Sequence, residues 1–425
     1  MKFKFAMRPV VAAVVACASV SAFATDGYFS HGYGMKAKGM GGAATTYTDS
    51  AFAGANNPAL SSWAGNRTEL GVDWFSPKRS ADSSMAPTNG PTIESGSNSF
   101  FIPEFGYNKA HDASWSYGLT IYGNGGMNTD YATNPVSYYN DGTHGRNQMS
   151  SQSPMGVNLE QLIVAPVLSY KVDETQSVGV SPLLVYQNIE VKGIQWFGDA
   201  PPAGMGMSSN ANALSNKGKS SSTGLGLRLG YFKRLNDQID LGLSYAPKIK
   251  MSKFDEYAGL FNGSFDIPEN YTLGLGFKVN SNTRVFFDYQ RINYNNVGAI
   301  GKPTANLLSG NVLGSANGPG FGWQNINVMK LGVEWRQTAA LTLRAGYNHS
   351  DNPIGATDVT FNIMAPGVMT KHYTLGGTYE LEKDRQVTFA YMYAPESSVT
   401  GANLFYQGND TIRMKQQSFG LQYAW

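Results

Sequence analysis

The sequence predicts an all-β protein, a 14-stranded antiparallel transmembrane β-barrel with an N-terminal hatch, or plug, inside the lumen. Three observations predict this fold. Apolar and polar residues alternate along many segments, short and long connections alternate between those segments, and the chain ends on Trp425 in phase with an apolar face. Period-two alternation indicates a strand with two different faces. Short turns at one end and long loops at the other are typical of bacterial outer-membrane barrels.

Residues 1–24 have the three parts of a secretory signal peptide. Basic residues precede an apolar run, and Ala22-Phe23-Ala24 follows it with the small residues that suit cleavage. We therefore expect cleavage after Ala24 and export to the bacterial outer membrane. A lipoprotein processing box that ends at Cys17 is the competing interpretation.

Residues 25–66 lie between this leader and the first predicted strand. They are rich in Gly and Ala and show no sustained alternation. A barrel of this size would otherwise enclose a water-filled channel, so we predict that the segment folds inside the lumen as a hatch. A flexible periplasmic extension is the alternative.

Residues 67–425 are expected to form the transmembrane barrel with its long extracellular loops. In the last strand, Phe419, Leu421 and Tyr423 share one face, and smaller or polar residues share the other. Charged residues on the opposite faces of the strands must point into the lumen, because Arg or Lys at the lipid midplane costs about 2 to 4 kcal/mol. These residues are Arg228, Lys278, Asp288, Lys330, Glu334, Arg336, Arg344 and Glu380.

Two kinds of connection alternate within the predicted barrel. A soluble β-sandwich has no reason to keep all its long connections at one end, so the alternation favours a barrel. We place the short links near 110–113, 173–175, 235–237, 280–282, 337–339 and 383–384. We place the long links near 76–98, 124–157, 192–218, 251–268, 296–325, 351–369 and 396–412.

Composition excludes several other classes of protein. Cys17 is the only cysteine, so the mature chain has no disulfide and no cysteine metal site. Past the leader, no apolar run reaches the roughly 20 residues of a membrane-spanning helix. The net charge of +2 becomes −1 without the three basic residues of the leader, since 2 − 3 = −1, and nothing favours binding of nucleic acid.

The histidines are scattered and no Gly-x-Ser-x-Gly motif occurs, so we expect no cofactor, no metal and no enzyme. A lipase with Ser and His from distant strands is the enzymatic alternative.

The start of the mature chain carries a more specific pattern. Residues 25–34 read Thr-Asp-Gly-Tyr-Phe-Ser-His-Gly-Tyr-Gly, and the segment continues to Asn57-Pro58-Ala59. In this context the chain resembles the long-chain fatty acid transporter (FadL/OmpP1/TodX) family, whose hatch has an Asn-Pro-Ala triplet as its hallmark. The resemblance covers the whole mature chain and implies fourteen strands and uptake of hydrophobic small molecules. No surface demands a partner chain, so we expect a monomer.

The third strand, at residues 117–131, resembles the family's kinked strand. In the family, pairing is broken there and a gap opens in the barrel wall. Gly123, Gly125 and Gly126 would then mark a lateral opening, and glycine suits this role because it bends and weakens a strand. For Gly125 and Gly126, a plain loop start is the alternative.

The resemblance also implies a ligand-binding groove between the third and fourth extracellular loops. By position these are residues 192–218 and 251–268. Exposed apolar residues on loops are costly unless they bind something or pack together, and packing between the loops is the alternative. The candidate ligand-binding residues are Trp196, Phe197, Tyr257, Leu260 and Phe261. The candidates to meet a fatty carboxylate are Lys192, Lys217, Lys219, Lys250 and Lys253.

Three functions compete at this point. The first is passive uptake of a fatty acid or hydrocarbon, which is captured by the loops and released sideways into the outer-membrane lipids. A lateral exit is favoured because each methylene group costs about 0.8 kcal/mol to expose to water. The second is a general porin for hydrophilic solutes, which the polar lumen motivates. The third is an adhesin or phage receptor that uses the long loops.

Overall fold

The computed structural model describes residues 26–85, 88–89, 91–135, 154–201, 204–382, 384–405 and 408–425. The leader, its predicted cleavage after Ala24 and the alternative at Cys17 lie outside the described residues.

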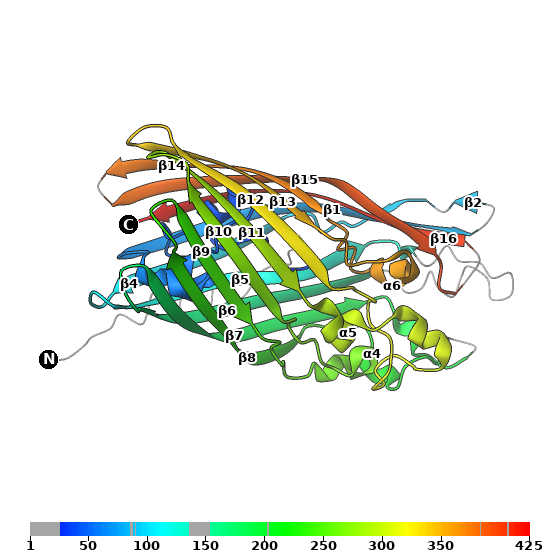
Figure 1. Cartoon of the computed structure of the whole chain (residues 1–425). Helices are drawn as coiled ribbons and strands as arrows, with labels where there is room; N and C mark the ends of the chain where they lie inside the picture. The colour runs from blue at the N-terminus through cyan, green and yellow to red at the C-terminus, as the bar shows by residue number, and fades with distance from the viewer. Residues whose placement is uncertain are drawn as a thin grey trace.

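Fourteen strands form one closed antiparallel barrel, which confirms the predicted fold class (Figure 1). Consecutive strands pair in sequence order, and the last strand closes the barrel against the first, with Leu70 opposite Tyr423. Two further short strands, β2 (Thr88–Asn89) and β3 (Ile93–Glu94), pair with β1. The barrel strands are β1 (Arg67–Met85), β4 (Phe100–Ala110), β5 (Trp115–Tyr131), β6 (Met155–Lys171), β7 (Gln176–Lys192), β8 (Ser220–Arg234), β9 (Ile239–Ala246), β10 (Asn270–Lys278), β11 (Thr283–Ile292), β12 (Ile326–Arg336), β13 (Leu341–Ser350), β14 (Lys371–Glu382), β15 (Arg385–Ala402) and β16 (Gly408–Ala424).

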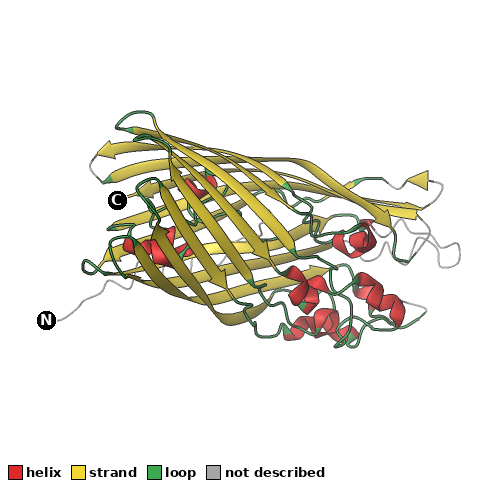
Figure 2. Cartoon of the chain, viewed as in Figure 1, coloured by secondary structure: helices red, strands yellow, loops and turns green. Residues whose placement is uncertain are grey.

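The two ends of the barrel differ, as the alternation of short and long links predicts. Short turns and the C-terminus lie at one end, and the loops with their short helices cover the other (Figures 1 and 2). No helix in the described ranges is both long and apolar enough to cross a membrane. The loop helices are η5 (Gln195–Phe197), η6 (Ala211–Ala213), η7 (Asp255–Tyr257), α4 (Ala258–Phe261), η8 (Tyr294–Asn296), α5 (Gly298–Gly301), η9 (Thr304–Ser309), η10 (Ala356–Asp358) and α6 (Val359–Asn362).

Three of the long links are shorter than the sequence pattern indicated. The predicted link at 76–98 begins ten residues too early, because β1 stays paired with β16 as far as Met85. Likewise β5 continues to Tyr131, and β15 continues to Ala402. Among the described side chains of these strand ends, no large apolar residue is exposed, so no apolar outer face marks them. Without an apolar face the period-two signal disappears although the ladder continues.

The wall of the barrel is apolar outside and polar inside. Side chains such as Leu225 and Leu375 are exposed on the outer face, as lipid contact requires. Of the charged residues predicted to face the lumen, five are buried inside the barrel: Arg228, Asp288, Lys330, Glu334 and Arg344. Lys278 and Arg336 are instead exposed, because each ends its strand beside a short turn.

The N-terminal segment, residues 26–66, lies inside the barrel as far as Ala64 (Figure 2). It contains α2 (Met35–Lys38), α3 (Ala53–Asn56) and η2 (Pro58–Ser62). Its backbone is bonded to separate strands of the wall. Met35 N donates to Gln422 of β16 at 3.0 Å, and Ala44 N donates to Asp288 of β11 at 2.9 Å. A buried ion pair between Lys38 and Asp73, at 2.9 Å, adds a third attachment on β1. The segment is therefore integrated with the wall on several sides.

Candidate functional site

The wall of the barrel is not hydrogen-bonded all the way around. Strands β4 and β5 pair only from Ala110↔Ser116 to Phe105↔Ile121. Beyond Ile121, β5 remains paired with β6 as far as Tyr131, but on its other edge no described strand continues the ladder. We call this stretch, between residues 100–104 of β4 and 122–131 of β5, the wall break.

A bulge in β5 lies at the wall break. The register with β6 shifts between Gly123 and Gly125, so Asn124 is the extra residue. The predicted glycines therefore flank a bulge inside a continuous strand, and the alternative of a loop start is wrong. Bulges bend a strand and interrupt its pairing.

The N-terminal segment occupies the free edge of β5 beside this bulge. Phe29 forms an isolated antiparallel bridge with Gly125. Ser30 N donates to Asn124 O at 3.0 Å, and Gly126 N donates to Tyr28 O at 3.2 Å. A Cβ atom at Gly125 would lie 1.8 Å from Tyr28 O, so only glycine permits this approach of the two backbones.

The chain before β4 bounds the wall break at its loop end. Gly96 N donates to Asp130 O of β5 at 2.8 Å, and Ser95 N donates to Arg79 O of β1 at 2.9 Å. The buried Arg79 guanidinium also donates to Ser97 O. The wall break is thus limited at one end by these bonds of Ser95 and Gly96 and at the other end by the pair of Phe105 with Ile121.

An apolar cavity lies between the loop-end halves of β5–β7 and four of the long loops. Its empty space, with the open mouth included, is about 850 Å³. Among the described residues that line it, Thr360 alone has a polar side chain and none is charged. The lining is Met127, Met155, Val157, Leu159, Ile189, Val191, Ile194, Phe197, Leu260, Phe261, Phe265, Ala299, Leu313, Pro319, Gly320, Phe321, Thr360, Phe361 and Met364.

The five predicted loop residues do not all reach this cavity. Phe197, Leu260 and Phe261 line it. Trp196 instead packs edge-on against Phe197, with ring centroids 5.3 Å apart. Tyr257 is fully buried and fixes its loop to the wall, since its hydroxyl accepts from Val191 N at 3.1 Å and donates to Gly218 O at 2.6 Å.

Sequence reasoning missed most of the cavity lining. The loops after β11 and β13 contribute residues such as Phe321 and Phe361, although neither loop was proposed to bind ligand. The inward faces of β6 and β7 contribute aliphatic residues such as Leu159 and Ile189. One signal for them was present. Lumen-facing positions are polar along most of the barrel, so a run of inward aliphatic residues at the loop end indicates a local apolar chamber.

A second, more polar cavity adjoins the first. It has about 510 Å³ of empty space with its mouth included, and it shares Phe261, Ala299 and Pro319 with the apolar cavity. Lys302 and Asp266 also line it, and the Lys302 ammonium donates to Ala316 O. None of the five lysines predicted to meet a carboxylate lines either cavity.

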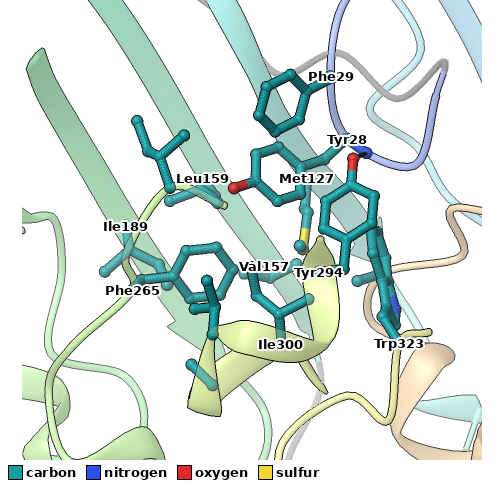
Figure 3. Close-up of a cluster of buried hydrophobic side chains, with 14 of the residues drawn as sticks. Tyr28, Phe29, Met127, Val157, Leu159, Ile189, Phe265, Tyr294, Ile300 and Trp323 are labelled. Carbon is teal, nitrogen blue, oxygen red and sulfur yellow. Dashed lines mark hydrogen bonds between the residues drawn. The ribbon is translucent and has the colours of Figure 1, made fainter. Parts of the chain in front are cut away.

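An aromatic cluster connects the apolar cavity with the N-terminal segment (Figure 3). The rings of Tyr28 and Phe265 lie 6.1 Å apart, and those of Tyr294 and Trp323 lie 5.2 Å apart. The Tyr294 hydroxyl accepts from Tyr28 N at 3.1 Å. Burial raises the pKa of the Tyr28 and Tyr294 phenols well above the usual value, so both are neutral at neutral pH.

The Asn57-Pro58-Ala59 triplet attaches the N-terminal segment to three neighbouring strands of the wall. The Asn57 amide donates to Tyr231 O of β8 at 3.0 Å, and its oxygen accepts from Ala59 N at 3.1 Å to cap η2. Pro58 occupies the first turn of η2, where a missing N–H costs nothing. The hydroxyls of Ser169 and Ser177 both donate to Ala59 O. The triplet thus anchors the segment to β6, β7 and β8.

Nowhere in the described ranges do three or more His, Cys, Asp or Glu side chains gather so that they could hold a metal ion.

Comparisons with known proteins agree with this architecture. The sequence model of a family described as "Outer membrane protein transport protein (OMPP1/FadL/TodX)" matches residues 11–423. No curated protein matches the chain.

Several crystal structures share the fold. The Pseudomonas putida toluene transporter TodX has a TM-score of 0.68 at 20% identity, over 93% of this chain and 98% of its own. A Pseudomonas aeruginosa FadL homologue has a TM-score of 0.68 at 15% identity, over 96% and 99% of the two chains. The Ralstonia pickettii toluene transporter TbuX has a TM-score of 0.63 at 19% identity, over 93% and 98%.

Proposed function

The chain belongs to the outer membrane protein transport protein (OMPP1/FadL/TodX) family, and we propose that it admits hydrophobic small molecules by passive diffusion. The apolar cavity is the observation that carries this proposal. A cavity with an uncharged lining suits an apolar ligand, because a polar solute would lose its hydration there without gaining hydrogen bonds. Transfer from water into the cavity is itself favourable for an apolar molecule.

The proposed route runs from the loops to the membrane. The ligand enters through the second, more polar cavity beside Lys302, passes Phe261 and then occupies the apolar cavity. It then displaces Tyr28 and Phe29 from the edge of β5 and leaves through the wall break into lipid. Two contacts support this path. Phe29 pairs with Gly125 at the break, and Tyr28 packs against the cavity residue Phe265.

Within this function we propose uncharged hydrocarbons as the preferred ligands. The absence of charge among the described lining residues supports this choice, and two of the structural relatives, TodX and TbuX, are toluene transporters. A fatty acid is the second candidate. Lys302 favours this candidate, because its side chain lines the second cavity. The carboxylate of the fatty acid could bind the Lys302 ammonium there while its hydrocarbon tail fills the apolar cavity.

The N-terminal segment is proposed to act as the hatch. It closes the lumen through its bonds to Gln422, Asp288 and Tyr231 on three sides of the wall. A general porin needs an open channel, so this packing opposes the porin alternative. We further propose a monomer in contact with outer-membrane lipids, a leader cleaved after Ala24, and transport without an enzymatic step.

The test is reconstitution of the protein in liposomes. Toluene and a fluorescent apolar probe should accumulate in the membrane of protein-containing liposomes faster than in empty ones. In planar bilayers the same protein should pass little ionic current. Large ohmic conductance without faster accumulation of the probe would favour the porin and overturn the proposal.

A further inference from the structure

Three buried amide side chains form a row directly beneath the apolar cavity. Asn124 is the bulge residue of β5, and Gln161 and Gln187 are register partners on β6 and β7. All three residues are at most 1% exposed. We call this row the amide ladder.

The amide ladder interrupts the aliphatic loop-end part of the inner face of β6 and β7. On the inward face of β6 and β7, the pair before Gln161 and Gln187 is Leu159 with Ile189, and the pair after it is Ile163 with Val185. Burying an amide costs its hydration unless every polar group finds a partner. A wall that needed only packing would be served by aliphatic residues here, as in the neighbouring pairs.

The hydrogen bonds of the amide ladder run in one direction. The Tyr33 hydroxyl donates to Asn124 Oδ1 at 2.8 Å, and Asn124 Nδ2 donates to Gln161 Oε1 at 3.0 Å. Gln161 Nε2 donates to Gln187 Oε1 at 3.0 Å, and Gln187 Nε2 donates to Phe265 O at 2.9 Å. Each amide uses its oxygen toward one neighbour and its nitrogen toward the next. Such chains polarise one another and behave as a unit.

The two ends of the amide ladder belong to different parts of the proposed route. Phe265 lines the cavity. Tyr33 belongs to the N-terminal segment, and its ring lies 4.1 Å from that of Tyr122 on β5. Between these ends, Asn124 forms the bulge, and its carbonyl accepts from Ser30 N beside the wall break. One hydrogen-bonded chain therefore connects the cavity, the bulge and the N-terminal segment.

We propose that Asn124, Gln161 and Gln187 are positioning residues that couple occupancy of the cavity to the state of the wall break. This inference rests on the proposed function. A ligand that moves Phe265 shifts the acceptor of Gln187. Because each amide is bonded to the next, the shift reaches Asn124 and Tyr33 and loosens the N-terminal segment from β5.

The test separates binding from transport in two single variants and their combination. Gln187→Leu breaks the ladder at the cavity end, and Tyr33→Phe breaks it at the hatch end. We expect each to slow liposome uptake of the apolar probe at least tenfold, while the affinity for the probe stays within twofold of wild type. The double variant should be no slower than the slower single variant, because residues that act as a unit are not additive.

Two further proteins make the test decisive. Gln416→Leu replaces another buried, inward-facing glutamine, on β16, and should leave uptake within twofold of wild type. Gln187→Met gives a second replacement at the same position if the leucine variant does not fold. Folding of each variant is checked on gels, where a folded barrel migrates differently before and after heating.

Several results would overturn the coupling. Unchanged uptake in both single variants would do so, and so would a joint fall in probe affinity and uptake rate. A double variant in which the two changes in the logarithm of the uptake rate simply add would also overturn it. If wild type itself shows no uptake, the proposed function falls, and the coupling falls with it. Normal wild-type uptake with unaffected variants removes the coupling alone.

Discussion

The hydroxyl of Tyr294, in the loop after β11, donates a 2.5 Å hydrogen bond to the backbone carbonyl of Asp26. The same oxygen accepts from Tyr28 N, so one phenol from the loop end holds two backbone groups of the N-terminal segment. Both groups are buried, and neither can turn to water if the phenol is removed. The loop after β11 and the N-terminal segment are therefore joined by two hydrogen bonds next to the apolar cavity.

Replacing Tyr294 by Phe should loosen the start of the N-terminal segment. A buried group left unsatisfied costs about 1 to 3 kcal/mol, so opening of this segment should become roughly ten- to a hundredfold more frequent. Hydrogen exchange of the peptide that contains residues 26–30 measures this directly. Tyr373→Phe changes an exposed tyrosine on the outer wall and should leave that exchange unaltered. Equal protection in Tyr294→Phe and wild type would contradict the role given to this phenol.

Replacing Gly125 by Ala should detach the N-terminal segment from β5. The new Cβ atom would collide with Tyr28 O at 1.8 Å, backbone against backbone, so the pairing with Phe29 cannot persist. We expect ionic conductance in planar bilayers to rise several-fold as the segment leaves the wall. Gly355→Ala is the matched control, because its Cβ atom would meet only Thr357 Oγ1 at 3.7 Å. An unchanged conductance in Gly125→Ala would show that the segment does not depend on this edge.

Placing a charge in the apolar cavity should abolish tight binding of an apolar ligand. Phe261→Asp puts a carboxylate at the junction of the two cavities, and ligand binding would then have to strip its hydration. We expect at least tenfold weaker binding of the fluorescent probe, measured by titration. Leu308→Asp places the same charge on an exposed loop position outside the lining and should bind as wild type does. If both variants lose affinity equally, the cavity is not the binding site.

Replacing Lys302 by Gln distinguishes the two ligand classes. A hydrogen bond to a charged group contributes about 1.5 to 3 kcal/mol, so the affinity for a fatty acid should fall about tenfold or more, while that for toluene should not change. Lys253→Gln is the control, since Lys253 lines neither cavity. Fatty-acid binding that is weakened only by Lys253→Gln would favour the loop lysines proposed from the sequence over Lys302.

The sequence was sufficient for the architecture because the relevant signal is local. Phe419, Leu421 and Tyr423 alternate in adjacent positions, and the first strand begins at the predicted Arg67. The signal failed where a strand leaves the lipid, as in β1 beyond Ser76, because no apolar face remains to reveal the pairing.

The site was predicted only in part because it is assembled from distant segments. Phe197 and Phe261 could be identified as loop aromatics, but Trp196 and Tyr257 look the same in sequence and have packing roles. Position along a loop does not specify which ring points inward. The amide ladder could not be predicted either, since it depends on a bulge that brings Asn124 beside Gln161.

Diffraction from crystals grown with 4-bromotoluene tests the central claim most directly, because bromine is located by its anomalous signal. The account predicts a bromine peak inside the apolar cavity, in contact with Leu159, Ile189 and Phe261. Bromine found only on the outer, lipid-facing wall, with ordered water filling that cavity, would contradict it.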